Sequence, residues 1–131
     1  MSTFNVSAVD WRAVILGRSC RYSRISETGL APEITRFDAH GLADDHFSMH
    51  NLLRPETVEA LWYMWRATGD WYYREAGWRI ARALERYART PYGYSSLENV
   101  RVPGSYTGHQ PTYFFSETLK YLYLLFSPDA M

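Results

Sequence analysis

This sequence contains almost no cysteine or lysine, and neither charge is in excess. Cys20 is the single cysteine among 131 residues, so an intramolecular disulfide and a cysteine-based zinc site are excluded. Lys120 is the single lysine, and 14 basic residues balance 14 acidic ones to leave a formal net charge of zero. A neutral chain has no overall positive field for phosphates, so we expect no nucleic-acid partner.

Long hydrophobic runs and targeting signals are also missing. No run approaches the roughly 18 apolar residues that cross a membrane, and the longest candidate, residues 113–126, is interrupted by Glu117 and Lys120. The first residues have no basic stretch followed by a long apolar core, as a signal peptide would. We therefore expect neither a membrane segment nor a leader in this chain.

Aromatic residues, by contrast, are abundant. Tyrosine, phenylalanine and tryptophan make up 17% of the chain, and its 47% of hydrophobic residues is too high for a disordered protein. A domain of this size buries only about two thirds of its surface. Many rings must therefore face solvent, a ligand or other protein, and rings beside arginines and carboxylates suit a surface that binds sugars.

Hydrophobic periodicity predicts an all-α chain with four helices, over residues 10–23, 54–68, 71–89 and 112–126. Pro55 suits a first helical turn, and Gly69 followed by Asp70 suits the end of one helix and the N-cap of the next. The second and third helices would form an α-hairpin. The predicted core stripes are Val58, Leu61, Trp62 and Trp65; Tyr73, Gly77, Ile80, Leu84 and Tyr87; and Phe115, Leu119, Leu122 and Phe126.

Two long loops separate the predicted helices, over residues 26–53 and 90–111. Strand patterns in them are weak, so we expect at most brief pairing. Loops of this length are uncommon in a compact domain unless they carry function. They would suit the rim of an active site.

The start of the second predicted helix carries two carboxylates. Glu56 and Glu59 are three residues apart, so they share one helix face, opposite the apolar stripe. A helix N-terminus favours their ionised form, which can accept a proton from water or hold waters around a cation. Acidic residues in a first helical turn are also ordinary, so a purely structural role stays open.

The last predicted helix pairs a ring with a carboxylate. Tyr113 and Glu117 are four residues apart, so the ring could stack on a sugar while the carboxylate accepts its hydroxyl hydrogens. An ordinary core helix with a solvated glutamate is the alternative. Glu33 stands in a loop between turn-forming residues and by itself indicates little.

Other chemistries find little support. The sequence has no glycine-rich phosphate loop, no His-Glu-x-x-His and no Gly-x-Ser-x-Gly. The first loop gathers three histidines and two aspartates whose spacing matches no known zinc pattern: His40, His46, His50, Asp44 and Asp45.

Four segments together resemble the class I α-mannosidases, glycoside hydrolase family 47. They are TGLAPEI (28–34), HNLLRPETVEALWYMWRATGD (50–70), GYSSLENV (93–100) and SETLKYLYLLFSPD (116–129), in the family's order and approximate spacing. The resemblance corresponds to the C-terminal part of a much longer catalytic domain. We therefore treat residues 1–131 as one partial domain, with residues 1–17 unmatched.

The resemblance implies a fold and an activity. The fold would be an (α/α)₇ barrel of helical hairpins, of which this chain is a portion. The activity would be inverting, Ca²⁺-dependent hydrolysis of terminal α-1,2-linked mannose from high-mannose N-glycans in the lumen of the endoplasmic reticulum or Golgi.

The resemblance also implies residue roles. Glu56 matches the candidate general base, and Glu33, Arg54, Tyr113 and Glu117 match residues that bind the glycan. Calcium would be held through water by three carboxylates: Glu56, Glu59 and Glu117.

Departures from the family pattern argue for reduced activity. The family usually reads Met-Glu-Ser-Phe-Phe where this chain has residues 110–114, so Pro111 replaces an acidic residue and Tyr113 replaces a phenylalanine. The terminal Thr-Glu-Ala-His segment, whose Thr binds calcium directly, and the part with the candidate general acid are not in this sequence. We expect an inactive fragment, whose partner would be the missing N-terminal part of the barrel. The alternatives are a mannosidase-like lectin of glycoprotein quality control and a helical scaffold piece.

Overall fold

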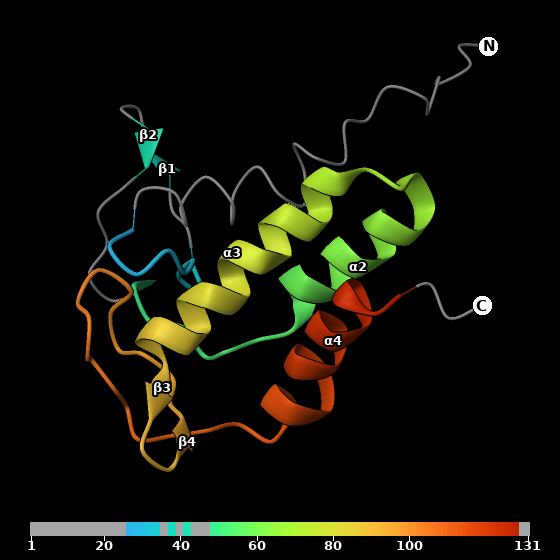
Figure 1. The fold of residues 1–131 in the computed structure, drawn as a ribbon. Coiled ribbons are helices and arrows are strands. Elements are labelled where there is room, and N and C mark those ends of the chain that lie inside the picture. The colour runs from blue at the N-terminus through green and yellow to red at the C-terminus, as the bar shows by residue number, and fades with distance from the viewer. Residues whose placement is uncertain (1–25, 35–36, 39–40, 43–47, 129–131) are drawn as a thin grey trace, which may run out of the picture.

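The fold was analysed in a computed structural model, which describes residues 26–34, 37–38, 41–42 and 48–128. The helix expected over residues 10–23 lies outside this part. The described chain contains an antiparallel helix pair, a third helical segment beside it, and ordered loops gathered at one end (Figure 1).

The antiparallel pair confirms the predicted α-hairpin. Helix α2 spans Glu56–Thr68 and helix α3 spans Trp71–Tyr87, two residues short of the predicted end. Pro55 lies at the N-cap position of α2, one residue before the first turn. Gly69 ends α2 in the left-handed conformation, with φ of 66°, and the Asp70 side chain accepts a hydrogen bond from the Tyr72 N–H. Glycine adopts this φ without steric cost, so the turn is tight.

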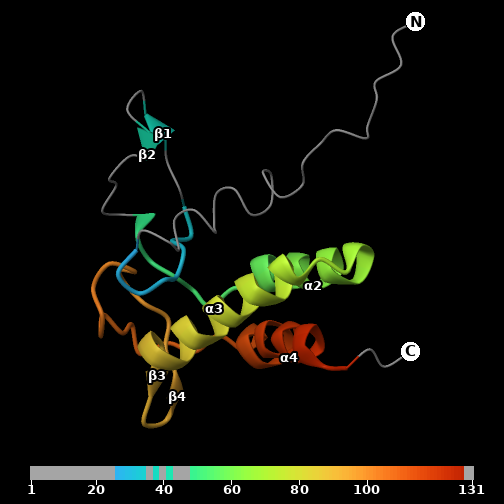
Figure 2. The same ribbon diagram turned by 45° about the horizontal axis from the view of Figure 1, so that its top comes forward.

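The last helical segment has two parts. A π-helix, η4, spans Phe114–Leu119, and helix α4 continues over Lys120–Phe126. The start of α4 contacts the start of α2 through Tyr121 and Glu59, while Arg74 at the start of α3 binds the end of α4. Helices α2 and α4 therefore run parallel to each other and antiparallel to α3 (Figures 1 and 2).

The π-helix corrects the predicted core stripe of this segment. Phe115 is 55% exposed and Phe126 is 37% exposed, so neither is a core residue. The buried side chains are Phe114, Thr118, Leu122 and Leu125. A π-turn needs more residues per turn than an α-helix, and this shifts which positions face the neighbouring helices.

The two long loops contain brief strand pairs, as expected. Strands β1 (Phe37–Asp38) and β2 (Gly41–Leu42) form one antiparallel hairpin, and β3 (Arg89–Thr90) and β4 (Gly93–Tyr94) form another. Single bridges also join Leu97 to Asn51 and to Tyr106. The loops thus connect to each other at the end of the molecule where α2 begins (Figure 2).

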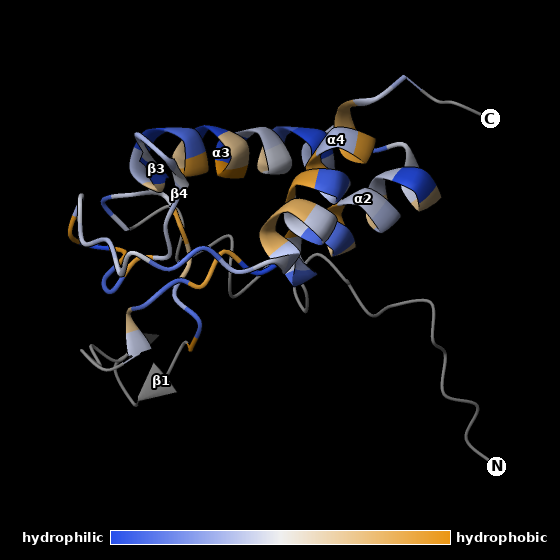
Figure 3. Ribbon diagram, turned by 90° about the horizontal axis from the view of Figure 1, so that it is seen from below, coloured by the Kyte–Doolittle hydropathy of each residue, from blue (hydrophilic) through white to orange (hydrophobic). Residues whose placement is uncertain are grey.

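The hydrophobic core has two parts. The larger joins the loops to the helices and includes Leu30, Leu53, Leu84, Leu97 and Phe114, among others. The smaller lies within the helices and consists of Leu61, Tyr73, Ala76 and Leu125. Each helix accordingly alternates hydrophobic and hydrophilic bands (Figure 3). Within the described residues, no helix has the length and apolar character needed to span a membrane.

Candidate functional site

The site is built on the segment just before α2, which both loops hold in place. Asn51 and Leu97 exchange two backbone hydrogen bonds of 2.9 Å, and the Asn51 side chain donates to the Ala31 carbonyl at 2.7 Å. The Val100 N–H also donates to the Met49 carbonyl at 2.8 Å. Three of the quoted sequence segments therefore meet at one point.

Glu33 binds this segment with both carboxylate oxygens. Its Oε1 accepts from the Leu52 N–H at 2.8 Å, and its Oε2 accepts from Arg54 Nε at 2.8 Å. The Glu33 side chain is 15% exposed, whereas that of Arg54 is 48% exposed. The hydrogen bond from Arg54 to Glu33 and the carboxylate charge raise the pKa of the guanidinium above its ordinary value. Glu33 thus orients Arg54 while the guanidinium stays open to a ligand.

Tyr113 also lies close to Arg54. The guanidinium carbon is 5.9 Å from the centre of the Tyr113 ring, within the range of a cation–π contact. The phenol donates to the Leu52 carbonyl at 2.8 Å. Burial raises the pKa of this phenol, and the charge of Arg54 opposes that rise. The structure therefore gathers three of the four residues that the resemblance assigns to glycan binding: Glu33, Arg54 and Tyr113.

Glu56 is the first residue of α2 and points into solvent. Its side chain is 67% exposed, and its Oε1 is 3.9 Å from Arg54 Nη1. An exposed carboxylate beside an arginine can accept a proton from water.

Glu59 and Glu117 lie near one ring, that of Tyr121. The Tyr121 hydroxyl donates to Glu59 Oε1 at 2.7 Å, which raises the pKa of this phenol to about 12, with smaller contributions from burial and from the charges of Glu59 and Glu117. The Tyr121 ring is 5.7 Å from that of Trp62 and 6.5 Å from that of Tyr63. Tyr121 therefore links the first turns of α2 and α4.

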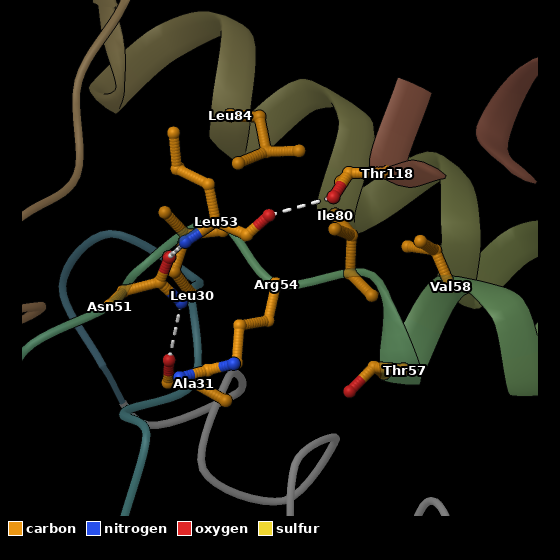
Figure 4. Close-up of a pocket in the computed structure, with 10 residues that line it drawn as sticks. All are labelled: Leu30, Ala31, Asn51, Leu53, Arg54, Thr57, Val58, Ile80, Leu84 and Thr118. Atoms are coloured by element: carbon orange, nitrogen blue, oxygen red, sulfur yellow. Dashed lines mark hydrogen bonds between the residues drawn. The ribbon is translucent and has the colours of Figure 1, made fainter. Parts of the chain in front are cut away.

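An apolar pocket lies beneath Arg54 (Figure 4). Leu30, Val58, Ile80 and Leu84 form its hydrophobic wall, and Thr118 lies at its edge. Asn51, Leu53 and Arg54 also line it, so the segment before α2 borders the pocket.

The described carboxylates do not form a direct metal site. Within the described residues, no group of three His, Cys, Asp or Glu side chains lies close enough to hold a metal ion. Carboxylates such as Glu56, Glu59 and Glu117 can instead accept hydrogen bonds from the waters around a hard cation. Of the histidines predicted as a weak alternative, His50 is described and half-buried, and the others lie outside the described part.

Three residues of the site were not predicted: Leu53, Thr118 and Tyr121. The sequence did offer an indication for Tyr121, because it follows Glu117 by one helical turn and so lies on the same helix face. The sequence offered no indication for Leu53, since a leucine residue does not by its type indicate a left-handed backbone conformation.

Paired helices with carboxylates, an arginine and a ring at one end define a helical-hairpin protein with a polar site suited to sugars. Residues 13–131 match the family described as Glycosyl hydrolase family 47. The chain therefore belongs to this family.

Relatives with known names agree. The chain is 45% identical over 117 residues to the endoplasmic reticulum mannosyl-oligosaccharide 1,2-alpha-mannosidase of Rattus norvegicus, covering 79% of this chain and 17% of that protein. Identity to the Homo sapiens protein of the same name is 46% over 116 residues, covering 82% and 17%. An Arabidopsis thaliana mannosyl-oligosaccharide 1,2-alpha-mannosidase is 39% identical over 137 residues, covering 88% and 22%.

A solved structure confirms the fold class. The alpha-1,2-mannosidase from Trichoderma reesei superposes with a TM-score of 0.78 at 24% identity, covering 89% of this chain and 28% of that chain. The chain is thus a portion of an (α/α)₇ barrel of helical hairpins. It spans about a sixth of the length of the rat and human relatives that it matches.

Proposed function

We propose that this chain forms the general-base and glycan-binding side of an inverting α-1,2-mannosidase site. The observation that carries the proposal is the grouping of Glu56, Arg54, Glu33 and Tyr113 at the start of α2. The names of the relatives support mannose linked α-1,2 as the sugar. High-mannose N-glycans on glycoproteins are the proposed substrate class, and the lumen of the endoplasmic reticulum or Golgi is the proposed compartment.

The proposed chemistry assigns one role to each side chain. Arg54, held by Glu33, donates hydrogen bonds to sugar hydroxyls, and the Tyr113 ring offers a face for stacking. Glu56 accepts the proton of a water that attacks the anomeric carbon from the face opposite the leaving group. Protonation of the leaving oxygen needs a second carboxyl group, which the family resemblance places outside this sequence.

Calcium is the proposed cofactor. Glu56, Glu59 and Glu117 would hold it through water, and the ion when bound would orient sugar hydroxyls and water. Tyr121 fixes one oxygen of Glu59 by donating a hydrogen bond to it. The missing portion of the barrel is a second proposed partner, because it would supply both the acid and the direct calcium ligand.

The test is a nuclear magnetic resonance titration of the purified chain with α-1,2-mannobiose. We expect shifts at the amides of Arg54 and Tyr113 at millimolar sugar, lost in Arg54→Ala. Glu98→Gln, an exposed carboxylate in the second loop, is the matched control and should bind as the unmodified chain does. Absence of any shift at millimolar sugar would contradict the proposal.

A hydrolysis assay with Ca²⁺ separates the enzyme from a binding module. Sugar binding without turnover is the expected result, because the family resemblance places the acid side outside this sequence. It would also suit the lectin-type alternative, which shares the group of Arg54, Glu33 and Tyr113. Ca²⁺-dependent turnover that disappears in Glu56→Gln would instead show that the chain carries a complete catalytic site.

A further inference from the structure

Two consecutive backbone carbonyls before α2 accept hydrogen bonds from two hydroxyls of the last helical segment. The Tyr113 hydroxyl donates to the Leu52 carbonyl at 2.8 Å, and the Thr118 hydroxyl donates to the Leu53 carbonyl at 2.7 Å. Thr118 is buried to 1% exposure, so its bond is shielded from water. Figure 4 shows the bond from Thr118 to Leu53 above the path of Arg54.

The segment held by these bonds is strained. Leu53 has a φ of 61°, the one left-handed backbone other than glycine among the described residues. A branched apolar residue rarely adopts this conformation unless the surroundings impose it, and such residues cluster at functional sites. The Leu53 N–H also donates to the Asn51 side chain at 2.9 Å, which completes the turn.

The π-helix places both hydroxyls on the same side. Tyr113 immediately precedes η4 and Thr118 lies near its end, five residues later. Five residues in an α-helix turn through about 500°, so the two side chains would diverge by roughly 140°. A π-turn closes an i to i+5 bond, so residues five apart lie near each other. The wider turn thus favours the approach of both hydroxyls to two successive carbonyls.

The strained turn sets the direction of the site residues. Arg54 follows Leu53 directly, and Glu56 begins α2 two residues later. Glu33 holds the same segment from the opposite side through the Leu52 N–H. The amide and the carbonyl of Leu52 are therefore both fixed, by a carboxylate and a phenol from separate parts of the chain.

We propose that Tyr113 and Thr118 are positioning residues, which hold Leu53 in its left-handed conformation and so aim Arg54 and Glu56 at the glycan. The part that concerns the glycan rests on the proposed function. The part that concerns the turn does not. Pinning the guanidinium and the carboxylate in advance lowers the entropy lost when the sugar binds.

The experiment uses the full chain with three variants: Tyr113→Phe, Thr118→Val and Thr118→Ser. The strong amide–Hα nuclear Overhauser effect within Leu53 reports its positive φ, and amide exchange of Leu53 reports opening of the turn. We expect Thr118→Val to weaken the first and to speed the second roughly fivefold, the value of one hydrogen bond. Tyr113→Phe should do the same to a smaller extent, and Thr118→Ser should restore both.

A matched control removes a phenol elsewhere on the same helical segment. Tyr123→Phe changes a ring that is 73% exposed, so both signals of Leu53 should stay as they are. The affinity for α-1,2-mannobiose should fall roughly fivefold in Thr118→Val and recover in Thr118→Ser.

The proposal is overturned if the double variant Tyr113→Phe, Thr118→Val keeps both Leu53 signals while its melting temperature falls. The hydroxyls would then contribute only to general stability. Failure of the proposed function would look different: the unmodified chain would bind no mannobiose. The Leu53 signals could still be measured in that case. If they changed in the variants, the role of the hydroxyls in the turn would still be supported.

Discussion

Arg54 interacts with three groups: the nearby carboxylate of Glu33, the more distant carboxylate of Glu56 and the ring of Tyr113. The short bond to Glu33 fixes the orientation of the guanidinium plane, while Glu56 at 3.9 Å leaves its terminal nitrogens accessible. Arginine suits this task because its planar group presents donors in a fixed geometry. The position of Glu33 is therefore as important to the site as that of Arg54.

Replacement of Glu33 by glutamine tests this dependence. A glutamine oxygen can still accept the Leu52 N–H, but its amide group opposes the Arg54 Nε–H with another donor. We expect affinity for α-1,2-mannobiose to fall roughly five- to tenfold in calorimetry, with little change in the melting temperature. Glu27→Gln, an exposed carboxylate in the same loop, is the control. Equal affinities for the two variants would contradict the role of Glu33.

A second prediction concerns the phenol of Tyr121, whose pKa is raised to about 12 by its hydrogen bond to Glu59. Glu59→Gln removes the charge, so the pKa should fall toward the ordinary value of about 10. Because the folded pKa is raised, this bond stabilises the fold fully below about pH 10 and is lost as the pH rises through about 12. Selective labelling of tyrosine and a magnetic resonance titration would measure the shift, and Glu75→Gln should leave it unchanged.

At this scale, the roles that the sequence suggested stay predictions, while the structure brings three of the named residues together: Glu33, Arg54 and Tyr113. Glu33 and Arg54 belong to segments that carry the family resemblance, whereas Tyr113 lies in the stretch that departs from it. Tyr121 and Thr118 were missed because their roles depend on hydrogen bonds to partners more than sixty residues away. Residue spacing contains no information on such contacts.

Among the secondary-structure elements, one arginine connects the ends of three helices. Arg74 on α3 donates from Nε to the Leu125 carbonyl at 2.7 Å and from Nη2 to the Ser127 carbonyl at 2.8 Å. Its guanidinium also lies 4.5 Å from the ring of Trp65 at the end of α2. A cation at a helix C-terminus satisfies carbonyls that have no partner within the helix and interacts favourably with the helix dipole.

Arg74→Ala should therefore destabilise the fold by about 2 kcal/mol, the contribution of hydrogen bonds to a half-buried charged group. Urea denaturation would show a lower midpoint with an unchanged slope. Arg74→Lys keeps the positive charge but loses the second donor direction. Its loss of stability should therefore lie between zero and that of Arg74→Ala. The control is Arg79→Ala, which removes an exposed pair with Glu75 on the same helix and should cost less than about 0.5 kcal/mol. Equal losses in both variants would contradict the role given to Arg74.

The elements themselves were predicted well where the helices are regular. The hairpin of α2 and α3 follows from the 3.6-residue period together with Gly69 and Asp70. In the last segment, Leu119 and Leu122 pack in the core as predicted, whereas Phe115 and Phe126 do not, since the same period was applied to a segment that begins as a π-helix. Phe115 and Phe126 are apolar and fit the α-helical spacing, so only the hydrogen bonds of η4 reveal the shift.

On the scale of the whole molecule, the chain is an open portion of a ring. An apolar groove runs between α3 and α4, lined by Trp78, Leu122, Tyr123 and Phe126. Trp78 and Tyr123 are more than half exposed there. Hairpin arrays bury such faces against the next hairpin, and this chain matches 28% of the solved barrel from Trichoderma reesei. This groove, which is separate from the candidate site, thus accounts for part of the high aromatic content of the sequence.

Calcium binding tests how much of the metal site this portion can supply. Glu56, Glu59 and Glu117 are proposed to hold the ion only through water, and the described residues bring no three metal-binding side chains together. We therefore expect a dissociation constant of about 1 mM or weaker, for which 1 mM Ca²⁺ stabilises the fold by only about 0.4 kcal/mol. The melting temperature in Ca²⁺ should then exceed that in chelator by less than about 2 °C, and Mg²⁺ should raise it by no more than Ca²⁺ does.

A rise of several degrees at micromolar Ca²⁺ that is lost in Glu59→Gln would contradict this expectation. Such a result would place a direct calcium ligand within this chain.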